Sequence, residues 1–441
     1  MPNALPLAAS DRIAVIGLGY VGLPLAVALA RRGAGAVTGF DIDPARVREL
    51  RQGRDRTGEV DPADLHPMPR LSFTGDPAAL RGQGVYIVTV PTPVDAANKP
   101  DLDPLLAACD LLGRALAGRP PADGAPVIVL ESTVYPGVTE QICGPAIARV
   151  SGLAAGEGFF LGYSPERINP GDRHHRLDGI VKVVAGATPA VTDRLAALYG
   201  RVSPAGIHRA PDIRTAEAAK AIENAQRDIN IAFVNEVAMI CGDLGLSVYD
   251  VLEAARTKWN FLDFRPGLVG GHCIGVDPFY LAHCARQLGH EAEVILAGRR
   301  INDAMGEHFA ARIAAAADSA GLGARPRSLV LGLTFKENLP DLRNSKVVDL
   351  IRGLGERGHV VEVHDPRADA AEAKALYGLD LSPGLDGAGF DCLVAAVAHE
   401  EYRRLTGEDL ARLTRPGGLI ADIKGIWRGR DLPAGRRRWQ L

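Results

Sequence analysis

A glycine-rich turn between an apolar run and a helical pattern constrains the fold of this chain more than any other feature. Residues 12–16, Arg-Ile-Ala-Val-Ile, form a β-rich run that leads into Gly-Leu-Gly-Tyr-Val-Gly at 17–22. A helical pattern at 23–32 follows, and a second apolar run at 36–40 ends at Asp41. A strand, a G-x-G-x-x-G turn, a helix, a strand and an acid, in this order, predict a parallel α/β sheet that binds a dinucleotide.

Each position of the turn has a physical role in this predicted site. Gly17 allows the tight turn, Gly19 lets the backbone approach a pyrophosphate, and Gly22 packs the helix against the strand. The helix N-terminus faces the phosphates. Asp41 can bind both ribose hydroxyls and favours NAD, because it would repel the 2′-phosphate of NADP. The residues expected to contact NAD here are Gly17, Gly19, Tyr20, Val21, Gly22 and Asp41.

Two further strand ends are expected to reach the same cofactor. The run at 84–90 stops at Pro-Thr-Pro, and the run at 127–130 stops at Glu-Ser-Thr. Ligands of an open α/β sheet sit beyond the carboxyl ends of strands, so Thr92 and Thr133 are candidate contacts. A hydroxyl that caps the following segment is the alternative at each position. Arg46 is expected to stack on adenine or to bind a cofactor phosphate.

A carboxylate stands at the end of another predicted strand. Phe-Phe-Leu-Gly-Tyr at 159–163 is followed by Ser-Pro-Glu, which places Glu166 just beyond the strand. A carboxylate in that place could hold or activate a water molecule, and a solvated loop charge is the alternative.

A long helix is predicted after the first α/β region. Residues 213–242 lack Pro and Gly until the final glycine and consist largely of good helix formers. At about 1.5 Å per residue the helix would span roughly 45 Å, enough to join two lobes and to offer an oligomer surface. Lys220 and Asn224 share one face, where they could stabilise an oxyanion or hold a water, and a solvated lysine is the alternative. Three apolar side chains are expected to be packed: Ile222, Ile229 and Phe233.

The stretch at 267–281 is the candidate reaction centre. Cys273 follows a glycine pair at 270–271, and Asp277 stands four residues beyond the thiol, before a proline. A thiolate on a glycine-lined bend can attack a carbonyl, and the carboxylate can handle a proton or a water. A buried cysteine without a chemical role is the alternative that spacing leaves open.

A second α/β lobe is predicted in the last third of the chain. It has no G-x-G-x-x-G, so a second dinucleotide site is not expected. Lys336, Arg343 and Lys424 follow strand ends, where they could meet phosphates. The basic tail at 435–441 is expected to be frayed. The apolar runs that alternate with helical patterns, and so indicate a parallel sheet, are 328–334, 360–364, 392–397 and 418–422.

Composition excludes several other classes of protein. A length of 441 residues predicts two or three domains, and a net charge of −3 gives no sign of nucleic acid or an anionic membrane as a partner. The six cysteines form no C-x-x-C pair, which argues against a zinc site and a disulfide framework and fits a reducing compartment. No signal peptide and no apolar run near the roughly 20 residues of a membrane span are recognisable, so a cytoplasmic protein is expected.

Together these segments resemble the UDP-glucose/GDP-mannose dehydrogenase family of nucleotide-sugar 6-dehydrogenases, over nearly the whole chain. The segment at 164–172 and the one at 270–278 are in the style of the UDP-N-acetylglucosamine and UDP-N-acetylgalactosamine branch, the Vi-polysaccharide type. UDP-glucose enzymes tend to have Glu where Pro170 stands and Lys where Val276 stands. The other matching segments are 17–22, 90–93, 131–133, Lys220 with Asn224, 335–343 and 422–425.

The resemblance implies an NAD-dependent, four-electron oxidation of the C6 alcohol of a UDP-N-acetylhexosamine, UDP-GlcNAc or UDP-GalNAc, to a uronic acid for surface polysaccharides such as capsule and O-antigen. The aldehyde would be held by the thiol as a thiohemiacetal and then as a thioester. UDP-N-acetylmannosamine and UDP-glucose are alternative substrates. The implied catalytic residues are Cys273, Lys220, Asn224, Asp277, Glu166 and Thr133, and the implied substrate contacts are Glu166, Arg167, Lys220, Asn224, Arg265, Gly271, Lys336 and Lys424. Arg343 would lie near NAD.

The resemblance also implies three domains and a homodimer that forms through the central helical region. An NAD-binding Rossmann-like domain is expected at 1–208, a central helical domain with the cysteine loop at 209–305, and a UDP-sugar-binding Rossmann-like domain at 306–441. Two other readings remain: a dehydrogenase that removes only two electrons, and a protein that binds NAD or sugar nucleotides without catalysis.

Overall fold

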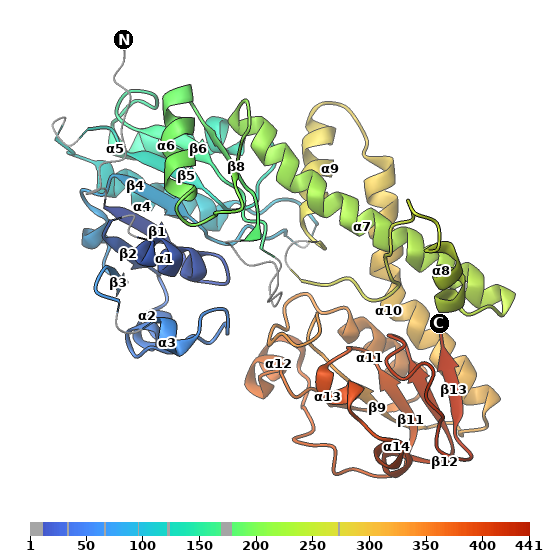
Figure 1. The fold of residues 1–441 in the computed structure, drawn as a ribbon. Helices are drawn as coiled ribbons and strands as arrows, with labels where there is room; N and C mark the ends of the chain where they lie inside the picture. The colour runs from blue at the N-terminus through green and yellow to red at the C-terminus, as the bar shows by residue number, and fades with distance from the viewer. Residues whose placement is uncertain are drawn as a thin grey trace. The chain divides into compact units, whose positions relative to one another are not determined.

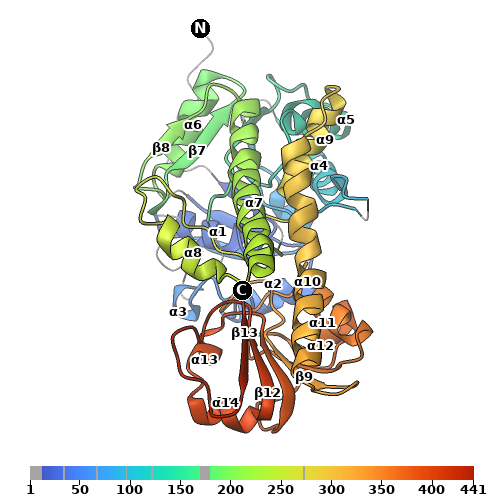
Figure 2. The same cartoon turned by 90° about the vertical axis from the view of Figure 1, so that its right-hand side faces the viewer.

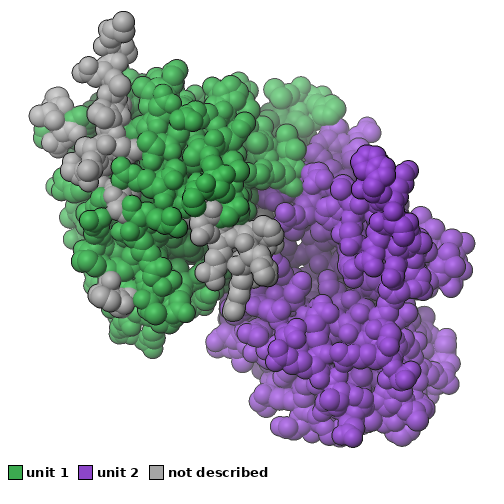
Figure 3. All heavy atoms as spheres, in the orientation of Figure 1, with its two compact units in different colours: residues 1–223, 279–290 green, residues 224–278, 291–441 purple. Residues whose placement is uncertain are grey.

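The computed structural model describes residues 12–32, 35–65, 68–95, 97–120, 124–168, 179–271 and 274–441. The chain divides into two compact units, coloured separately in Figure 3: Met1–Glu223 with Phe279–His290, and Asn224–Pro278 with Glu291–Leu441. Each unit contains a sheet of its own, and one long helix runs from the first unit into the second (Figure 1). The expected fold class, two parallel-sheet α/β lobes with a long helix between them, is confirmed.

Short buried strands form the sheet of the first unit. Among the described residues the strand order is β3-β2-β1-β4-β5-β6-β7-β8, and only β6 and β7 pair antiparallel. β1, β4 and β5 are buried along their whole length, as parallel strands covered on both faces are. The strands are β1 (Ile13–Ile16), β2 (Val37–Phe40), β3 (Leu71–Thr74), β4 (Val85–Val88), β5 (Val127–Leu130), β6 (Phe160–Tyr163), β7 (Lys182–Gly186) and β8 (Ile207–Arg209).

The helices of the first unit begin where the sequence supplies capping residues. Asp43 and Thr188 accept hydrogen bonds from N–H groups of the first turns of α2 and α6, and a proline follows each cap. Side chains of α1 and α6 share one core with Ile13 and Val15 of β1. The helical segments are α1 (Gly22–Arg31), α2 (Pro44–Arg51), α3 (Pro62–Leu65), η1 (Pro77–Leu80), α4 (Asp103–Leu116), η3 (Thr139–Cys143), α5 (Gly144–Ser151) and α6 (Pro189–Tyr199).

The predicted long helix is confirmed as α7 (Ile213–Leu244), which begins at the expected residue and continues through Gly242. The expectation that its apolar side chains are packed is wrong for two of them, because Ile222 is 53% exposed and Phe233 is 56% exposed in this chain. Within the second unit α7 runs beside α10, where Gly298 lets the two helices approach at Ala232 (Figure 2). The neighbouring helices are α8 (Val248–Ala255), α9 (Asp277–Gln287) and α10 (Glu293–Ser319).

The sheet of the second unit is parallel throughout, in the order β10-β9-β11-β12-β13 over the described residues. The expectation of a frayed tail is wrong: β13 pairs with β12, and Trp439 packs against the core of this lobe. The strands are β9 (Arg327–Leu331), β10 (Val360–His364), β11 (Phe390–Ala395), β12 (Thr414–Asp422) and β13 (Arg437–Gln440). The helices are α11 (Val347–Glu356), α12 (Ala370–Tyr377), α13 (Glu400–Arg403) and α14 (Gly407–Leu413).

Candidate functional site

The turn between β1 and α1 requires two of its three glycines for steric reasons. Gly17 has a φ of +93°, and a Cβ there would stand 3.0 Å from the carbonyl oxygen of Thr89. A Cβ on Gly22 would stand 1.9 Å from the carbonyl oxygen of Gly17, which no side chain tolerates. The position of a Cβ on Gly19 meets nothing within 4 Å, so the space above this residue is open to a ligand. A dinucleotide phosphate therefore fits at Gly19 and at the helix N-terminus behind it.

Asp41 follows β2 and reaches back to the glycine turn. Its Oδ2 accepts a hydrogen bond of 2.8 Å from the Leu18 N–H, and its Oδ1 accepts one of 2.9 Å from the Asp43 N–H. A carboxylate oxygen can accept more than one hydrogen bond, so this partly exposed side chain keeps capacity for ribose hydroxyls.

Arg46 is buried and contacts the glycine turn. Its side chain is 3% exposed, its Nε donates a 2.8 Å hydrogen bond to the Leu18 carbonyl, and its guanidinium pairs with Asp55 at 2.8 Å. Burial acts to raise the pKa of Asp55, but hydrogen bonds from Thr57, Val60 and Arg46 hold it below its ordinary value. The guanidinium therefore braces the turn from inside the fold, and its contact with adenine or phosphate stays a prediction.

The ends of β4 and β5 are tied together by their hydroxyl side chains. Thr92 Oγ1 donates a 2.7 Å hydrogen bond to the Thr133 carbonyl, and Ser132 Oγ donates one of 2.6 Å to the Val90 carbonyl. The structure thus brings the two predicted threonines to one edge of the sheet, beside the glycine turn that follows the neighbouring strand β1. The edge is the place where an open α/β sheet holds its ligands.

A buried ionic cluster, Glu131, Glu166, Lys182 and Tyr199, lies at the same edge, and the sequence pointed only to its Glu166. Lys182 Nζ stands 2.7 Å from Glu131 Oε2 and 3.1 Å from Glu166 Oε2. The Tyr199 hydroxyl donates a 2.5 Å hydrogen bond to Glu131 Oε1. All four side chains are at most 7% exposed. The sequence feature that could have revealed this cluster is Lys182 at the start of the apolar strand β7, because a buried charge is costly unless it is paired.

This cluster determines the protonation of Glu166. Burial acts to raise its pKa, but the Lys182 ammonium and the N–H groups of Ile168 and Arg167 outweigh burial and hold the pKa below its ordinary value. Burial raises the pKa of Glu131 despite the same lysine. Glu166 Oε1 accepts both N–H groups at 2.6 Å. The solvated-charge alternative for Glu166 is therefore wrong, and its carboxylate is better suited to hold a water than to take a proton from it.

Arg167, a predicted substrate contact, is engaged within the first unit. Its NH2 pairs with Glu223 Oε1 of α7 at 2.8 Å, and its NH1 donates a 2.9 Å hydrogen bond to the Val181 carbonyl. The ion pair links the end of β6 to the long helix that carries the next two candidates.

Those candidates are Lys220 and Asn224, four residues apart on one face of α7, and both are 6% exposed. The alternative of a solvated lysine is therefore wrong. Asn224 Nδ2 donates a 2.5 Å hydrogen bond to Oδ2 of Asp277, which begins α9 and is 2% exposed. Two residues that the sequence separates by more than fifty positions thus meet in one buried contact. Cys273, the predicted nucleophile, lies outside the described residues.

Neighbouring groups of the second unit leave no room for a side chain at either glycine of the pair before Cys273. A Cβ on Gly271, where φ is +84°, would stand 2.6 Å from the ring of Phe335, and one on Gly270 would stand 2.5 Å from the Asn344 carbonyl oxygen. A Cβ on Gly267 would stand 2.9 Å from Nζ of Lys424. Three motif segments, which contain the glycine pair, Phe335 and Lys424, are therefore in contact.

A hollow in the second unit lies where these segments meet. The hollow is small, about 20 Å³, and its lining combines apolar side chains from the segments that follow β9 and β11 with charged groups. It therefore marks a place where one polar group of a ligand could contact these segments. The lining residues are Leu268, Gly270, Phe335, Glu337, Ser345, Lys346, Val347, Ala396, Val397 and Lys424.

Three predicted contacts of the second unit do not line this hollow. Arg265 is exposed and lies 3.9 Å from Asp263. Arg343 is held by Asp341 in a two-point contact, with Nε and NH2 at 3.0 and 2.7 Å from the carboxylate oxygens. The Lys336 side chain is partly exposed, and its carbonyl accepts a hydrogen bond from Thr334. A ligand role for each of these three stays a prediction.

The part of the chain that the structure describes contains neither a metal-binding group of side chains nor a membrane-spanning helix. No group of three or more His, Cys, Asp or Glu side chains there could hold a metal ion. No helix of that part is both long and apolar enough to cross a membrane.

Three domain models of one protein family match most of the sequence. The NAD binding domain of the UDP-glucose/GDP-mannose dehydrogenase family matches residues 11–203, its central domain matches 214–304, and its UDP binding domain matches 329–429. The glycine turn lies in the first of these matches, the Asn224–Asp277 contact lies in the second, and part of the hollow lies in the third.

Individual relatives agree with this match. A UDP-N-acetyl-D-glucosamine 6-dehydrogenase from Pseudomonas aeruginosa is 47% identical over 416 residues, which cover 94% of this chain and 96% of that protein. Protein CapL from Staphylococcus aureus is 47% identical over 430 residues, which cover 97% and 99%. The structure of a UDP-D-ManNAc dehydrogenase from Pyrococcus horikoshii superposes with a TM-score of 0.85 at 28% identity and covers 97% of this chain and 98% of that one.

Proposed function

Since this chain belongs to the UDP-glucose/GDP-mannose dehydrogenase family, we propose that it oxidises the C6 alcohol of a UDP-N-acetylhexosamine to the uronic acid. The observation that carries the proposal is the buried contact between Asn224 and Asp277, because it puts an amide and a carboxylate together beside the segment that bears Cys273. NAD, when bound at the glycine turn, supplies the hydride acceptor for both oxidations.

We assign proton removal, nucleophilic attack and oxyanion stabilisation to side chains of this protein. The C6 hydroxyl loses its proton to Asp277, directly or through a water held near Lys220. The Cys273 thiolate attacks the aldehyde carbon and holds it as a thiohemiacetal, which becomes a thioester after the second oxidation. Asn224 and Lys220 donate hydrogen bonds to the oxyanion.

Hydrolysis of the thioester releases the product. A water held by Asp277 or Glu166 attacks the thioester carbon, and the Cys273 thiolate leaves. The lowered pKa of Glu166, which follows from its pairing with Lys182 against the effect of burial, favours the holding role for that residue. Asp277 is the better candidate to take the proton. Thr133 follows β5, which pairs with the strand that ends before Glu166. We assign Thr133 to contacts with the attacking water and with NAD.

UDP-GlcNAc or UDP-GalNAc is the substrate we propose. Support comes from the 47% identity to the Pseudomonas aeruginosa protein named for UDP-N-acetyl-D-glucosamine, against 33% for a Salmonella typhi protein named for UDP-N-acetyl-D-mannosamine. We assign the uridine diphosphate to the hollow of the second unit. Lys424 lines the hollow and supplies a cation that a diphosphate needs. Lys336 and Arg265 do not line it, and we assign them to the same ligand on the family resemblance alone. The similarity to CapL supports a role in capsule or related surface polysaccharides.

The assembly and the domain limits belong to the same proposal. We propose a cytoplasmic homodimer with domains 1–208, 209–305 and 306–441. The three family matches support the division into three domains. A stripe of exposed apolar side chains on α7 supports the dimer, because these side chains recur at helical spacing: Ile222, Phe233, Ile240 and Leu244.

One experiment tests the reaction. NADH formed at 340 nm is measured with limiting UDP-GlcNAc, UDP-GalNAc, UDP-ManNAc and UDP-glucose, one at a time. Two equivalents of NADH per sugar are expected with one of the N-acetylhexosamines. One equivalent would instead support a two-electron dehydrogenase, and none with any sugar would support a binding protein.

A matched variant tests the covalent step. Cys273→Ser is expected to lose at least about a thousandfold in turnover, because the hydroxyl is a far weaker nucleophile. Cys284→Ser, a change at a partly exposed cysteine in α9, is the control and should keep wild-type turnover. Full activity of Cys273→Ser would contradict a thioester intermediate.

A further inference from the structure

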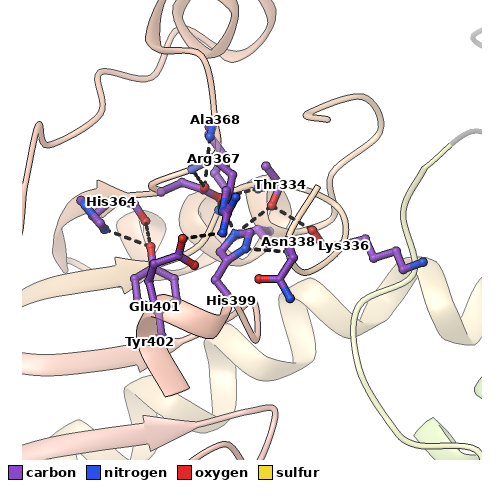
Figure 4. A network of polar contacts seen from close by, with 12 residues as sticks. Thr334, Lys336, Asn338, His364, Arg367, Ala368, His399, Glu401 and Tyr402 are labelled. Atoms are coloured by element: carbon purple, nitrogen blue, oxygen red, sulfur yellow. Dashed lines mark hydrogen bonds and ion pairs between the residues drawn. The ribbon is translucent and has the colours of Figure 1, made fainter. Parts of the chain in front are cut away.

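A buried histidine and aspartate stand behind the loop that lines the hollow of the second unit. We propose that His399 and Asp365 are positioning residues that hold residues 333–338 in the shape that binds the nucleotide diphosphate. The inference rests on the proposed function, because it takes a UDP-sugar as the ligand of the hollow. Figure 4 shows the polar contacts that carry it.

His399 is completely buried and uses both ring nitrogens on this loop. Its Nδ1 accepts a 2.9 Å hydrogen bond from the Asn338 N–H, so the proton of the ring is on Nε2. Nε2 then lies 3.0 Å from Thr334 Oγ1 and 3.1 Å from Asp365 Oδ2. One imidazole therefore joins the beginning of the loop to its end.

Asp365 follows β10 and holds the start of the loop through the backbone. Its Oδ2 accepts hydrogen bonds of 2.6 and 2.8 Å from the N–H groups of Leu333 and Thr334. Its Oδ1 accepts the N–H groups of Arg367 and Ala368 at 2.8 and 3.1 Å. Burial acts to raise the pKa of Asp365, but the hydrogen bonds from His399 and from the backbone hold it well below its ordinary value.

The loop itself is shaped by two further contacts. Thr334 Oγ1 donates a 3.1 Å hydrogen bond to the Lys336 carbonyl, which closes a tight bend. Asn338 has a φ of +60°, and its Oδ1 accepts a 2.9 Å hydrogen bond from the Glu400 N–H, at the start of the helix next to His399. A non-glycine residue in this left-handed region needs such support, because the conformation is disfavoured for a side chain.

The loop reaches the hollow through two of its side chains. Phe335 and Glu337 line it, and the Phe335 ring lies against Gly271, next to the segment that carries Cys273. A displaced loop would therefore change the wall of the hollow and the surroundings of the glycine pair. Neither His399 nor Asp365 lines the hollow, so both act only through the loop.

Two substitutions at His399 test the contributions of its two ring nitrogens separately. Asparagine keeps an oxygen near the place of Nδ1 that can accept the Asn338 N–H, whereas glutamine reaches toward the place of Nε2 and loses that acceptor. His399→Gln is expected to weaken UDP binding about tenfold, the effect of one lost buried hydrogen bond, and to raise the KM for the UDP-sugar by the same factor. His399→Asn should stay within about threefold of wild type.

The controls distinguish positioning from general damage. His359→Asn replaces another buried histidine of the same lobe, whose Nδ1 contacts Ser328, and should leave UDP affinity unchanged. Titration calorimetry with UDP alone and with NAD alone gives the two affinities for each variant. NAD affinity should not change in His399→Gln. Equal loss of UDP and NAD affinity, or wild-type UDP affinity, would overturn the inference.

A second variant keeps the test open if His399→Gln does not fold. Thr334→Val removes only the hydroxyl that links His399 to the Lys336 carbonyl, and it should weaken UDP binding about threefold to tenfold. Unchanged binding in that variant counts against the inference. Because UDP binding needs no oxidation, a wild-type protein that binds UDP but oxidises no UDP-sugar would contradict the proposed function while these comparisons still decide the role of His399.

Discussion

The α/β lobe of each unit begins with a strand that leads into a similar glycine turn. The two turns differ in how fully the aspartate beside each is hydrogen-bonded. In the first lobe β1 leads into Gly17, and in the second β9 leads into Gly332, with φ values of +93° and +98°. In both, the strand next to it in the sheet ends in an aspartate, Asp41 or Asp365, that accepts a hydrogen bond from a backbone N–H just after the glycine. The repeated geometry makes the difference between the two aspartates informative.

The Asp41 carboxylate can still accept hydrogen bonds from a ligand, whereas the acceptor sites of Asp365 are occupied by the protein. Asp41 is partly exposed and has hydrogen bonds from two backbone N–H groups, whereas Asp365 is 6% exposed and has four of them together with His399. The first carboxylate can therefore bind ribose hydroxyls, and the second cannot do so without losing its own partners. The same local turn thus leaves one aspartate with acceptor capacity and the other with its acceptors occupied, according to the number of partners that the fold supplies to each.

The largest expected effect is on stability, and it should appear in the second lobe only. Asp365→Ala leaves buried N–H groups without an acceptor and should lower the free energy of unfolding by about 3–5 kcal/mol. Asp41→Ala should cost about 1 kcal/mol. All three tryptophans of the chain belong to the second unit, so tryptophan fluorescence in denaturant reports the Asp365 variant. The labelling rate of the buried thiols Cys109 and Cys143 in the first unit reports the Asp41 variant. Equal effects of the two substitutions would remove the contrast.

The next effect concerns the ionic cluster of the first lobe. Lys182→Met leaves Glu131 and Glu166 buried without their cation and should destabilise the first unit by about 3 kcal/mol. The labelling rate of the buried thiols Cys109 and Cys143 measures opening of this unit. Lys99→Met, at an exposed lysine, is the control, with an expected change below about 0.5 kcal/mol. A Lys182→Met protein as stable as wild type would show that the cluster is not needed for folding.

A smaller effect tests the free capacity of Asp41. Asp41→Asn removes the charge that favours NAD over NADP, so the Kd for NAD should rise about tenfold, or about 1.4 kcal/mol, and the preference over NADP should fall. Titration of each nucleotide gives both values. UDP affinity serves as the internal control and should not change. An unaltered NAD affinity would mean that the ribose is held by other groups.

The smallest effect is a difference in acid sensitivity. Burial opposes ionisation of Asp365, but its hydrogen bonds hold the folded-state pKa well below the ordinary value of 3.8. A depressed folded-state pKa gives stability that is complete above the unfolded-state value and is lost as the pH falls toward the folded-state value. The second unit of wild type should therefore lose stability with falling pH below about 4. Asp365→Asn should flatten this slope, and an unchanged slope would assign acid sensitivity to other carboxyl groups.

Local patterns in the sequence were sufficient for several elements. The glycine turn, the end of β2 at Asp41 and the start of α7 at Ile213 all depend on residues close in the chain, so their spacing predicts them. The β13 strand was missed because a basic run such as Arg436 to Arg438 indicates solvent. Only its pairing with β12 and the packing of Trp439 reveal an edge strand.

Contacts between distant residues were decided by the tertiary structure alone. Strand β7 indicates that Lys182 needs a partner, but only the fold shows that the partners are Glu131 and Glu166. Likewise, only the fold shows that the Arg46 guanidinium pairs with Asp55. The sequence by itself determined the family, the cofactor turn and the long helix, because motifs and periodicity are local. Which charges are buried, and whether an aspartate after a strand is left for a ligand or taken up by the backbone as at Asp365, depends on partners that only folding brings together.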